Sequence, residues 1–208
     1  MTVAAVILAA GSGSRFGGQK LLANLRGRPV LAHVVDTARD AGLDPIVVVV
    51  PPDGSLDDLD LGAVRRVVNA LPEQGLSSSV RLGLGAVGAL AEPADVDAAV
   101  ILLGDQPSVR PDVIHRLLAE TETAGGALLV APRYAHDGAP NPVVARRQGW
   151  RLADELVGDR GFGPILDGRP DLVRRIDVSG ANPDIDTRED LDRLDRLADS
   201  GPTNGDVS

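Results

Sequence analysis

Residues 3–20 read VAAVILAAGSGSRFGGQK, an apolar run followed directly by a glycine-rich loop. An unbroken apolar run of this length predicts a strand covered on both faces, as in a parallel sheet. The loop closes on Lys20, the one lysine among 21 basic residues. Lysine carries a compact point charge and arginine a planar fork. A single lysine at the end of this loop predicts that Lys20 contacts a phosphate that requires an ammonium group. The alternative interpretation is that a lysine stands here by chance.

Length and composition predict one domain over residues 1–198 and a disordered tail over residues 199–208. The chain has no cysteine, which excludes disulfides and thiolate metal sites and fits a reducing compartment. A net charge of −9 argues against nucleic acid and anionic membranes as partners. No stretch approaches the ~20 apolar residues of a membrane helix, and the apolar start lacks the basic residues of a signal peptide. We therefore expect a cytoplasmic protein.

Strand-like and helix-like segments alternate through most of the chain. The expected strands are residues 3–8, 46–50, 64–68, 98–103 and 127–131, and the expected helices are residues 29–41, 77–90 and 111–124. This alternation predicts an α/β fold with a mostly parallel sheet and right-handed crossovers. The regular alternation ends after Pro132. Beyond it, the expected elements are a strand at 142–145, short helices at 150–156 and 162–166, a strand at 172–178 and a final helix at 188–197.

The glycine-rich loop follows the first expected strand, where ligands bind in open α/β sheets. It matches neither of two familiar phosphate-binding patterns. A dinucleotide fingerprint needs a third glycine where Phe16 stands, and a P-loop needs a lysine directly after Gly18. The loop still offers backbone amides, Arg15 and Lys20 to a polyphosphate. An ordinary connection, which is the alternative, needs neither charge.

Two aspartates are candidate metal ligands. Asp105 follows the strand at 98–103 and lies in the sharp turn GDQP (104–107). A carboxylate beside a phosphate loop suits Mg²⁺, which takes few protein oxygens and completes its octahedron with phosphate and water. A turn aspartate bonded to its own backbone is the alternative. Asp186 precedes the last expected helix and is either a second ligand or a residue that favours the helix N-terminus beside a capping pair, Thr187 and Asp190.

The segment QGLSSS (74–79) opens the second expected helix. Free amides and three hydroxyls at a helix start can read a base or a sugar, although one serine would suffice for capping. The three histidines are scattered without metal-ligand spacing, and nothing in the sequence indicates covalent catalysis.

Several motifs together resemble the MobA-like nucleotidyltransferases and, within them, the molybdenum cofactor cytidylyltransferases. They are LAAG (8–11) with Arg15, Gly17 and Lys20, then QGLSSS (74–79), GDQP (104–107), GDRG (158–161) and DIDT (184–187). The resemblance implies a Rossmann-like three-layer α/β/α sandwich. It also implies transfer of a nucleotidyl group from a nucleoside triphosphate to a phosphorylated acceptor, with release of pyrophosphate.

The same resemblance implies roles for ten residues. The triphosphate would bind at Ala9, Ala10, Gly11, Arg15 and Lys20, while Asn69, Gly75 and Ser77 would lie by the base and ribose. Asp105 and Asp186 would ligate Mg²⁺, and Lys20, Arg15 and Asp105 would be the catalytic groups.

CTP is the expected donor, because Ala10 stands where the guanylyl branch of the group has glycine and its methyl narrows the pocket toward a pyrimidine. The expected acceptor is molybdopterin, and the implied partner is a molybdenum hydroxylase. Asn141 stands where the family often has a histidine, near the expected acceptor side. A sugar phosphate or another small phosphorylated compound is an alternative acceptor. A non-catalytic delivery protein that binds a nucleotide or pterin is an alternative function.

Overall fold

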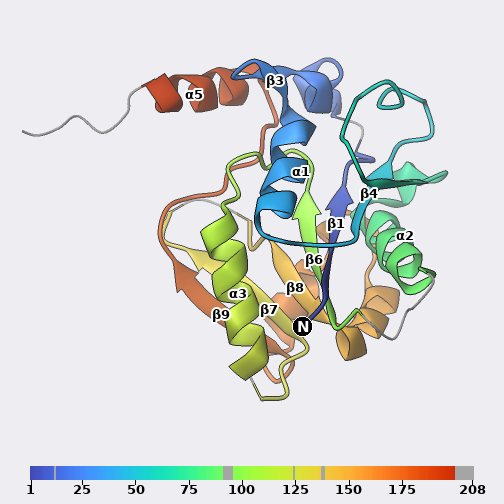
Figure 1. Cartoon of the computed structure of the whole chain (residues 1–208), viewed down its shortest axis with the longest axis vertical. Helices are drawn as coiled ribbons and strands as arrows, with labels where there is room; N and C mark the ends of the chain where they lie inside the picture. The colour runs from blue at the N-terminus through green and yellow to red at the C-terminus, as the bar shows by residue number, and fades with distance from the viewer. Residues whose placement is uncertain (12, 91–95, 124, 137–138, 200–208) are drawn as a thin grey trace, which may run out of the picture.

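The computed structural model describes residues 1–11, 13–90, 96–123, 125–136 and 139–199. Its centre is a seven-stranded sheet with the strand order β5-β4-β1-β6-β8-β7-β9 (Figure 1). Three parts of the sequence expectations lie outside the described residues: Ser12 of the glycine-rich loop, Ala124 at the end of a helix, and residues 200–208 of the tail. Within the described ranges, no helix is long and apolar enough to cross a membrane.

Four strands run parallel in one half of the sheet. They are β1 (Val3–Leu8), β4 (Ile46–Val50), β5 (Arg65–Val68) and β6 (Ala98–Leu103). Every residue of β1 is buried, as its unbroken apolar run predicts. Because β1 lies between β4 and β6, their carboxyl ends meet at one edge of the sheet, where the glycine-rich loop begins.

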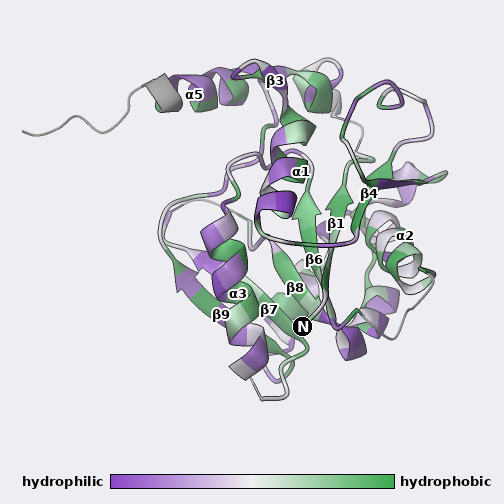
Figure 2. Ribbon diagram, in the orientation of Figure 1, coloured by the Kyte–Doolittle hydropathy of each residue, from purple (hydrophilic) through white to green (hydrophobic). Residues whose placement is uncertain are grey.

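Helices cover both faces of this sheet and complete three layers. α1 (Val30–Asp40) and α3 (Pro111–Thr123) pack on one face and lie in front of the strands in Figure 1. α2 (Leu76–Gly88) packs on the opposite face. Alternate residues of β1 pack into the apolar cores on the two faces of the sheet. Both faces of β1 are therefore apolar, and the strand is green in Figure 2. The expected α/β/α sandwich is confirmed.

The other half of the sheet contains the strand expected at 127–131 and the two strands expected after the alternation ends. β7 (Leu129–Tyr134) and β9 (Val173–Val178) pair in parallel, whereas β8 (Val143–Arg146) is antiparallel to both β6 and β7. The sheet is therefore mostly parallel, as expected, with one inserted antiparallel strand among those described.

Three short helical elements connect β8 to β9. They are η5 (Arg147–Glu155), η6 (Gly158–Arg160) and α4 (Gly163–Gly168). η5 is a 3₁₀ helix that begins before the helix expected at 150–156. Its Trp150 Nε1 donates to Ala145 O at 3.0 Å, which holds this segment against the preceding strand.

A small hairpin of β2 (Asn24–Leu25) and β3 (Arg28–Pro29) has no counterpart in the sequence predictions. Its turn residues Arg26 and Gly27 have φ of 52° and 80°, the left-handed pair that a tight hairpin uses. Strands of two residues are too short to show an alternation of apolar and polar residues, so the sequence pattern does not reveal them.

The last helix, α5 (Arg188–Asp199), packs on this hairpin and ends one residue beyond the expected domain limit at 198. A third apolar cluster joins Phe16 of the glycine-rich loop, Leu25 of the hairpin, Ile185 and the apolar face of α5. Ile185 is fully buried there. Its burial holds the neighbouring Asp186 beside the loop, although the two are far apart in the sequence.

Candidate functional site

A cavity of about 720 Å³ opens at the carboxyl ends of β1 and β6. Of the ten residues singled out from the sequence, eight line it: Ala9, Ala10, Gly11, Arg15, Lys20, Gly75, Asp105 and Asp186. A cavity of this size suits a nucleotide-sized ligand. Its position follows from the topology, because the loops after parallel strands gather at the edge where those strands end.

Lys20 is the electrostatic centre of the cavity. It begins the short 3₁₀ helix η2 (Lys20–Leu22), and its side chain is only 11% exposed. Its Nζ donates to Asp105 Oδ2 at 2.6 Å and to Asp186 Oδ1 at 3.4 Å. The loop thus delivers its one ammonium to both candidate metal ligands at once.

Arg15 supplies a second positive charge from the same loop. It lies in η1 (Ser14–Phe16), and its Nη1 is 3.6 Å from Asp186 Oδ2. The Arg15 side chain is 81% exposed, so this ion pair contributes little to stability. An exposed guanidinium at the mouth of a cavity can move to meet an incoming anion.

Asp105 is held over the loop by close packing of the turn before it. Gly104 N donates to Leu8 O at 2.9 Å, and a Cβ on Gly104 would lie 3.1 Å from that same oxygen. Asp105 O accepts a hydrogen bond from Ile185 N at 3.0 Å. These contacts join the end of β6 to the end of β1 and to the segment that carries Asp186.

Asp186 does not cap the last helix with its own carboxylate. Asp190 makes the capping contacts, because its Oδ2 accepts from the backbone N–H groups of Asp186 and Thr187 and from the Thr187 hydroxyl. The hydroxyl contact is the main reason that the pKa of Asp190 is lowered. The Asp186 side chain, 48% exposed, remains available to the cavity.

Asp105 and Asp186 fit a divalent cation that takes hard oxygen ligands. One oxygen of each lies within 3.4 Å of the same Lys20 nitrogen, so a single cation can be reached by both. Over the described ranges, no group of three or more histidine, cysteine, aspartate or glutamate residues forms a metal site. A two-carboxylate site that leaves positions for phosphate and water suits Mg²⁺ better than a metal held in an all-protein cage.

A network of hydrogen-bonded polar side chains lies next to Asp105. Gln106 Nε2 donates to Asp184 Oδ1 at 2.6 Å, and Asn182 Nδ2 donates to Gln106 Oε1 at 3.1 Å. Desolvation, followed by the negative charge of Asp105, raises the pKa of Asp184 above its usual value of 3.8. The network orders the backbone on both sides of Asp105.

The same network extends to the expected acceptor side. The carbonyl of Asn141 accepts from Asn182 Nδ2 at 3.2 Å and from the Tyr134 hydroxyl at 3.0 Å. Desolvation raises the pKa of Tyr134 to about 12, so its hydroxyl stays protonated and remains a donor at neutral pH.

Asn69 and Ser77 do not line the cavity. Asn69 is 1% exposed, and its Nδ2 donates to Ser78 Oγ at 2.8 Å and Ser79 Oγ at 3.0 Å. Its Oδ1 accepts from Leu71 N at 3.0 Å. Ser77 is also buried, and its hydroxyl donates to Gln74 O. These polar groups bond within the wall rather than facing the cavity.

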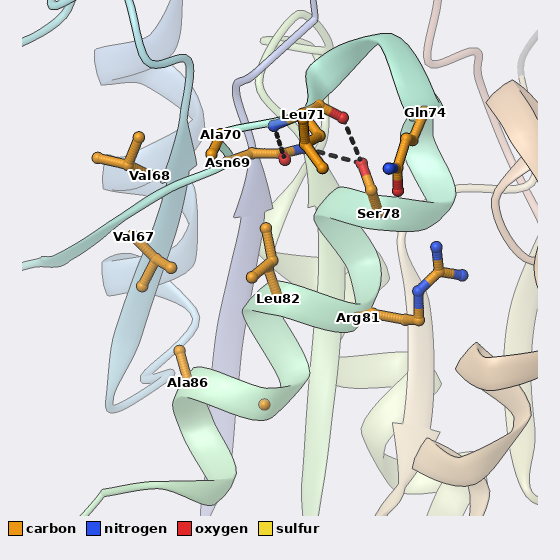
Figure 3. Close-up of a pocket in the computed structure, with 11 residues that line it drawn as sticks. Val67, Val68, Asn69, Ala70, Leu71, Gln74, Ser78, Arg81, Leu82 and Ala86 are labelled. Carbon is orange, nitrogen blue, oxygen red and sulfur yellow. Dashed lines mark hydrogen bonds between the residues drawn. The ribbon is translucent and has the colours of Figure 1, made fainter.

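Figure 3 shows the outer side of that wall, where Asn69, Leu71 and Ser78 bond to one another. Here Val67 and Val68 of the edge strand β5, together with Leu82 and Ala86 of α2, line a groove of about 570 Å³. The groove is apolar and lies beside the cavity that contains Lys20, but it shares no lining residue with it.

Nine further residues line the cavity without an individual role assigned from the sequence, and Glu73, Ser79 and Asp159 are the polar side chains among them. Ser79 lines the cavity, while its hydroxyl also accepts from Asn69. Asp159 lines it from η6, and its Oδ1 accepts from Leu76 N at 3.2 Å. The only signal for Asp159 was its place in the GDRG segment, to which no role was attached.

Comparison with known proteins gives a consistent result. A family model described as "MobA-like NTP transferase domain" matches residues 5–174. A curated relative, 2-C-methyl-D-erythritol 4-phosphate cytidylyltransferase of Cereibacter sphaeroides, is 39% identical over 137 residues. That match covers 64% of this chain and 59% of the relative, so the chain spans well under two thirds of the relative's length.

Solved structures give matches over nearly the whole chain. The crystal structure of Rv0371c from Mycobacterium tuberculosis H37Rv has a TM-score of 0.81 at 29% identity, covering 94% of this chain and 98% of that one. Rv0371c in complex with manganese has a TM-score of 0.77 at 26% identity, covering 94% and 99% of the two chains.

Proposed function

This chain belongs to the MobA-like NTP transferase family, and from that premise we propose that it transfers CMP from CTP to a phosphorylated acceptor and releases pyrophosphate. The observation that carries the proposal is the meeting of Lys20, Asp105 and Asp186 in one cavity. An ammonium and two carboxylates at the end of a glycine-rich loop can bind a triphosphate together with a divalent cation. The manganese complex of a similar protein supports a divalent metal.

In the proposed reaction, an oxygen of the acceptor phosphate attacks the α-phosphorus of CTP. A new phosphorus–oxygen bond forms to the acceptor, and the bond from the α-phosphorus to the oxygen that bridges to the β-phosphate breaks. The electron pair leaves with pyrophosphate. Because the nucleophile is already an anion, the protein needs to provide positioning and charge neutralisation rather than a strong base.

The charged residues would divide this work. Lys20, Arg15 and the amides of the loop would neutralise the β- and γ-phosphates and the departing pyrophosphate. Asp105 and Asp186 would hold Mg²⁺, which supplies positive charge to the phosphate oxygens when it is bound. Lys20 is paired with both carboxylates. It would therefore exchange them for phosphate oxygens when the nucleotide enters.

The donor and acceptor rest on finer observations. Ala10 is 4% exposed and lines the cavity, so its methyl reduces the room for a base. The cytidylyltransferase among the relatives supports CTP. We assign molybdopterin as the acceptor, with a molybdenum hydroxylase as the receiving partner, from the order of the sequence motifs. The name of the same relative favours a second candidate, a phosphorylated sugar alcohol.

Pyrophosphate release tests the proposal directly. The purified chain with Mg²⁺ is supplied with CTP, GTP, ATP or UTP, each with molybdopterin, 2-C-methyl-D-erythritol 4-phosphate or a sugar phosphate. We expect pyrophosphate from CTP with molybdopterin. Release with another acceptor alone would transfer the assignment to the second candidate. Tight binding of CTP without pyrophosphate from any acceptor would identify a delivery protein instead.

A further inference from the structure

The GDRG segment and the first turn of α2 interlock at the cavity wall. Gly75, which precedes α2, has φ of +85°, a conformation that favours glycine. A Cβ there would lie 2.5 Å from the carbonyl carbon of Gly158 and 2.6 Å from Asp159 Oδ1. A Cβ on Gly161 would lie 2.9 Å from Leu76 Cδ2. At Gly75 the two segments therefore touch backbone to backbone, and this position has no room for a side chain.

Asp159 makes the polar contact between the GDRG segment and the first turn of α2. No side chain at the N-cap position caps α2, and the N–H of its first residue, Leu76, donates to Asp159 Oδ1 at 3.2 Å. A carboxylate at this place also complements the positive end of the helix dipole. The cap comes from a residue 83 positions away, which fixes η6 and the start of α2 as one unit.

The unit faces the same cavity as Lys20. Gly75, Leu76 and Asp159 all line it, together with the basic residues of the loop. Asp159 contacts the start of the QGLSSS segment, which the family resemblance places by the base and ribose, while Arg15 and Lys20 suit the phosphates. The proposed function thus gives the cavity a phosphate end at the glycine-rich loop and a nucleoside end at Asp159.

Resting on the proposed function, we propose that Asp159 is a positioning residue for nucleotide binding. By accepting from Leu76 N, it holds the backbone of residues 74–76 in the shape that the base and ribose meet. A preorganised wall raises affinity because the loop does not have to be ordered when the ligand binds. The role concerns binding of the nucleotide and not the bond-breaking step.

The test compares Asp159→Ala, Asp159→Asn and a control, Asp154→Ala, an exposed aspartate in the neighbouring η5. Asp159→Ala should weaken CTP binding about tenfold, as loss of one hydrogen bond to a charged group predicts. KM for CTP should rise by the same factor with kcat unchanged, the pattern of lost uniform binding. Asp159→Asn keeps an accepting oxygen and should restore most of the affinity.

Hydrogen exchange separates this inference from the proposed reaction. The amides of residues 76–78 should exchange faster in Asp159→Ala than in wild type, Asp159→Asn or Asp154→Ala, even if no acceptor gives turnover. Absence of pyrophosphate would end the proposed reaction and leave these comparisons standing. Equal exchange and equal CTP affinity in all four proteins would overturn the positioning role. An Asp159→Asn variant as weak as Asp159→Ala would overturn it too, because charge alone would then be responsible.

Discussion

The two ends that we propose for the cavity are built differently. At the phosphate end, charged side chains pair with one another through contacts that a ligand can replace: Lys20 with Asp105 and Asp186, and Arg15 with Asp186. In the wall behind the nucleoside end, Asn69, Ser77 and Ser78 are buried and bonded within the protein. The charged pairs can exchange partners with a ligand, whereas the buried polar groups of the wall already have partners within the protein.

This difference predicts opposite consequences of substitution. A residue at the phosphate end acts on an incoming charge, so its loss should reduce turnover and leave the fold intact. A residue at the nucleoside end satisfies buried polar groups, so its loss should reduce stability first. The variants below follow this contrast from the largest expected effect to the smallest.

Asp105→Ala should lower turnover by about 10²–10³, the usual cost of losing one group that stabilises transition-state charge. Asp105 is 24% exposed and its main partner, Lys20, keeps Asp186, so the fold should survive. Steady-state kinetics and thermal unfolding measure both effects. Near-normal turnover would remove Asp105 from the catalytic groups.

Asn69→Ala should destabilise the protein by about 1–3 kcal/mol, because the variant removes the acceptor of the Leu71 N–H and the donor to the Ser78 and Ser79 hydroxyls. The free energy of unfolding in urea gives this value. Loss of turnover with unchanged stability would contradict the structural role and return Asn69 to direct contact with the ligand.

Lys20→Arg tests whether the shape of the cation matters. The Lys20 side chain is almost buried between two carboxylates, and the larger planar guanidinium cannot occupy the same point. We expect turnover to fall about tenfold or more, the scale for one misplaced charged contact. Kinetics of Lys20→Arg and Lys20→Met should then be alike, and full activity in Lys20→Arg would refute the argument from shape.

Asp184→Asn should produce the smallest effect and a pH dependence of known sign. The folded state raises the pKa of Asp184 above 3.8, so the ionised carboxylate costs stability at neutral pH and the protonated form does not. The asparagine variant should therefore be slightly more stable than wild type at pH 7, by at most about 0.5 kcal/mol. Thermal unfolding between pH 7 and pH 3 should show the stability difference between the variant and the wild type shrinking. A stability difference that grows in acid would contradict the expected sign.

Much of the fold follows from the sequence because its central strands β1, β4 and β6 are apolar and almost entirely buried. The expected limits at 3–8, 46–50 and 98–103 coincide with β1, β4 and β6. The hairpin of β2 and β3 could not be found, since its strands are too short for a pattern. The 3₁₀ form of η5 depends on contacts with β8 that the local sequence does not specify.

The candidate site divides in the same way. Lys20, Asp105 and Asp186 could be singled out because a lone lysine and two aspartates follow strands or precede a helix. Their mutual contacts depend on Ile185 and Phe16 sharing a core, which is a tertiary fact. Asn69 and Ser77 were expected by the base and ribose from the family resemblance, and the sequence could not tell that their side chains bond within the protein. Asp159 was passed over because its partner, Leu76 N, is distant in the chain.

A crystal structure with Mn²⁺ and a non-hydrolysable CTP analogue tests the shared triphosphate site most directly. We predict that Lys20 Nζ leaves Asp105 for a phosphate oxygen and that one manganese ion, located by its anomalous signal, is bound by Asp105 and Asp186. A triphosphate bound elsewhere, with Lys20 still paired to Asp105 and no cation beside it, would contradict the account.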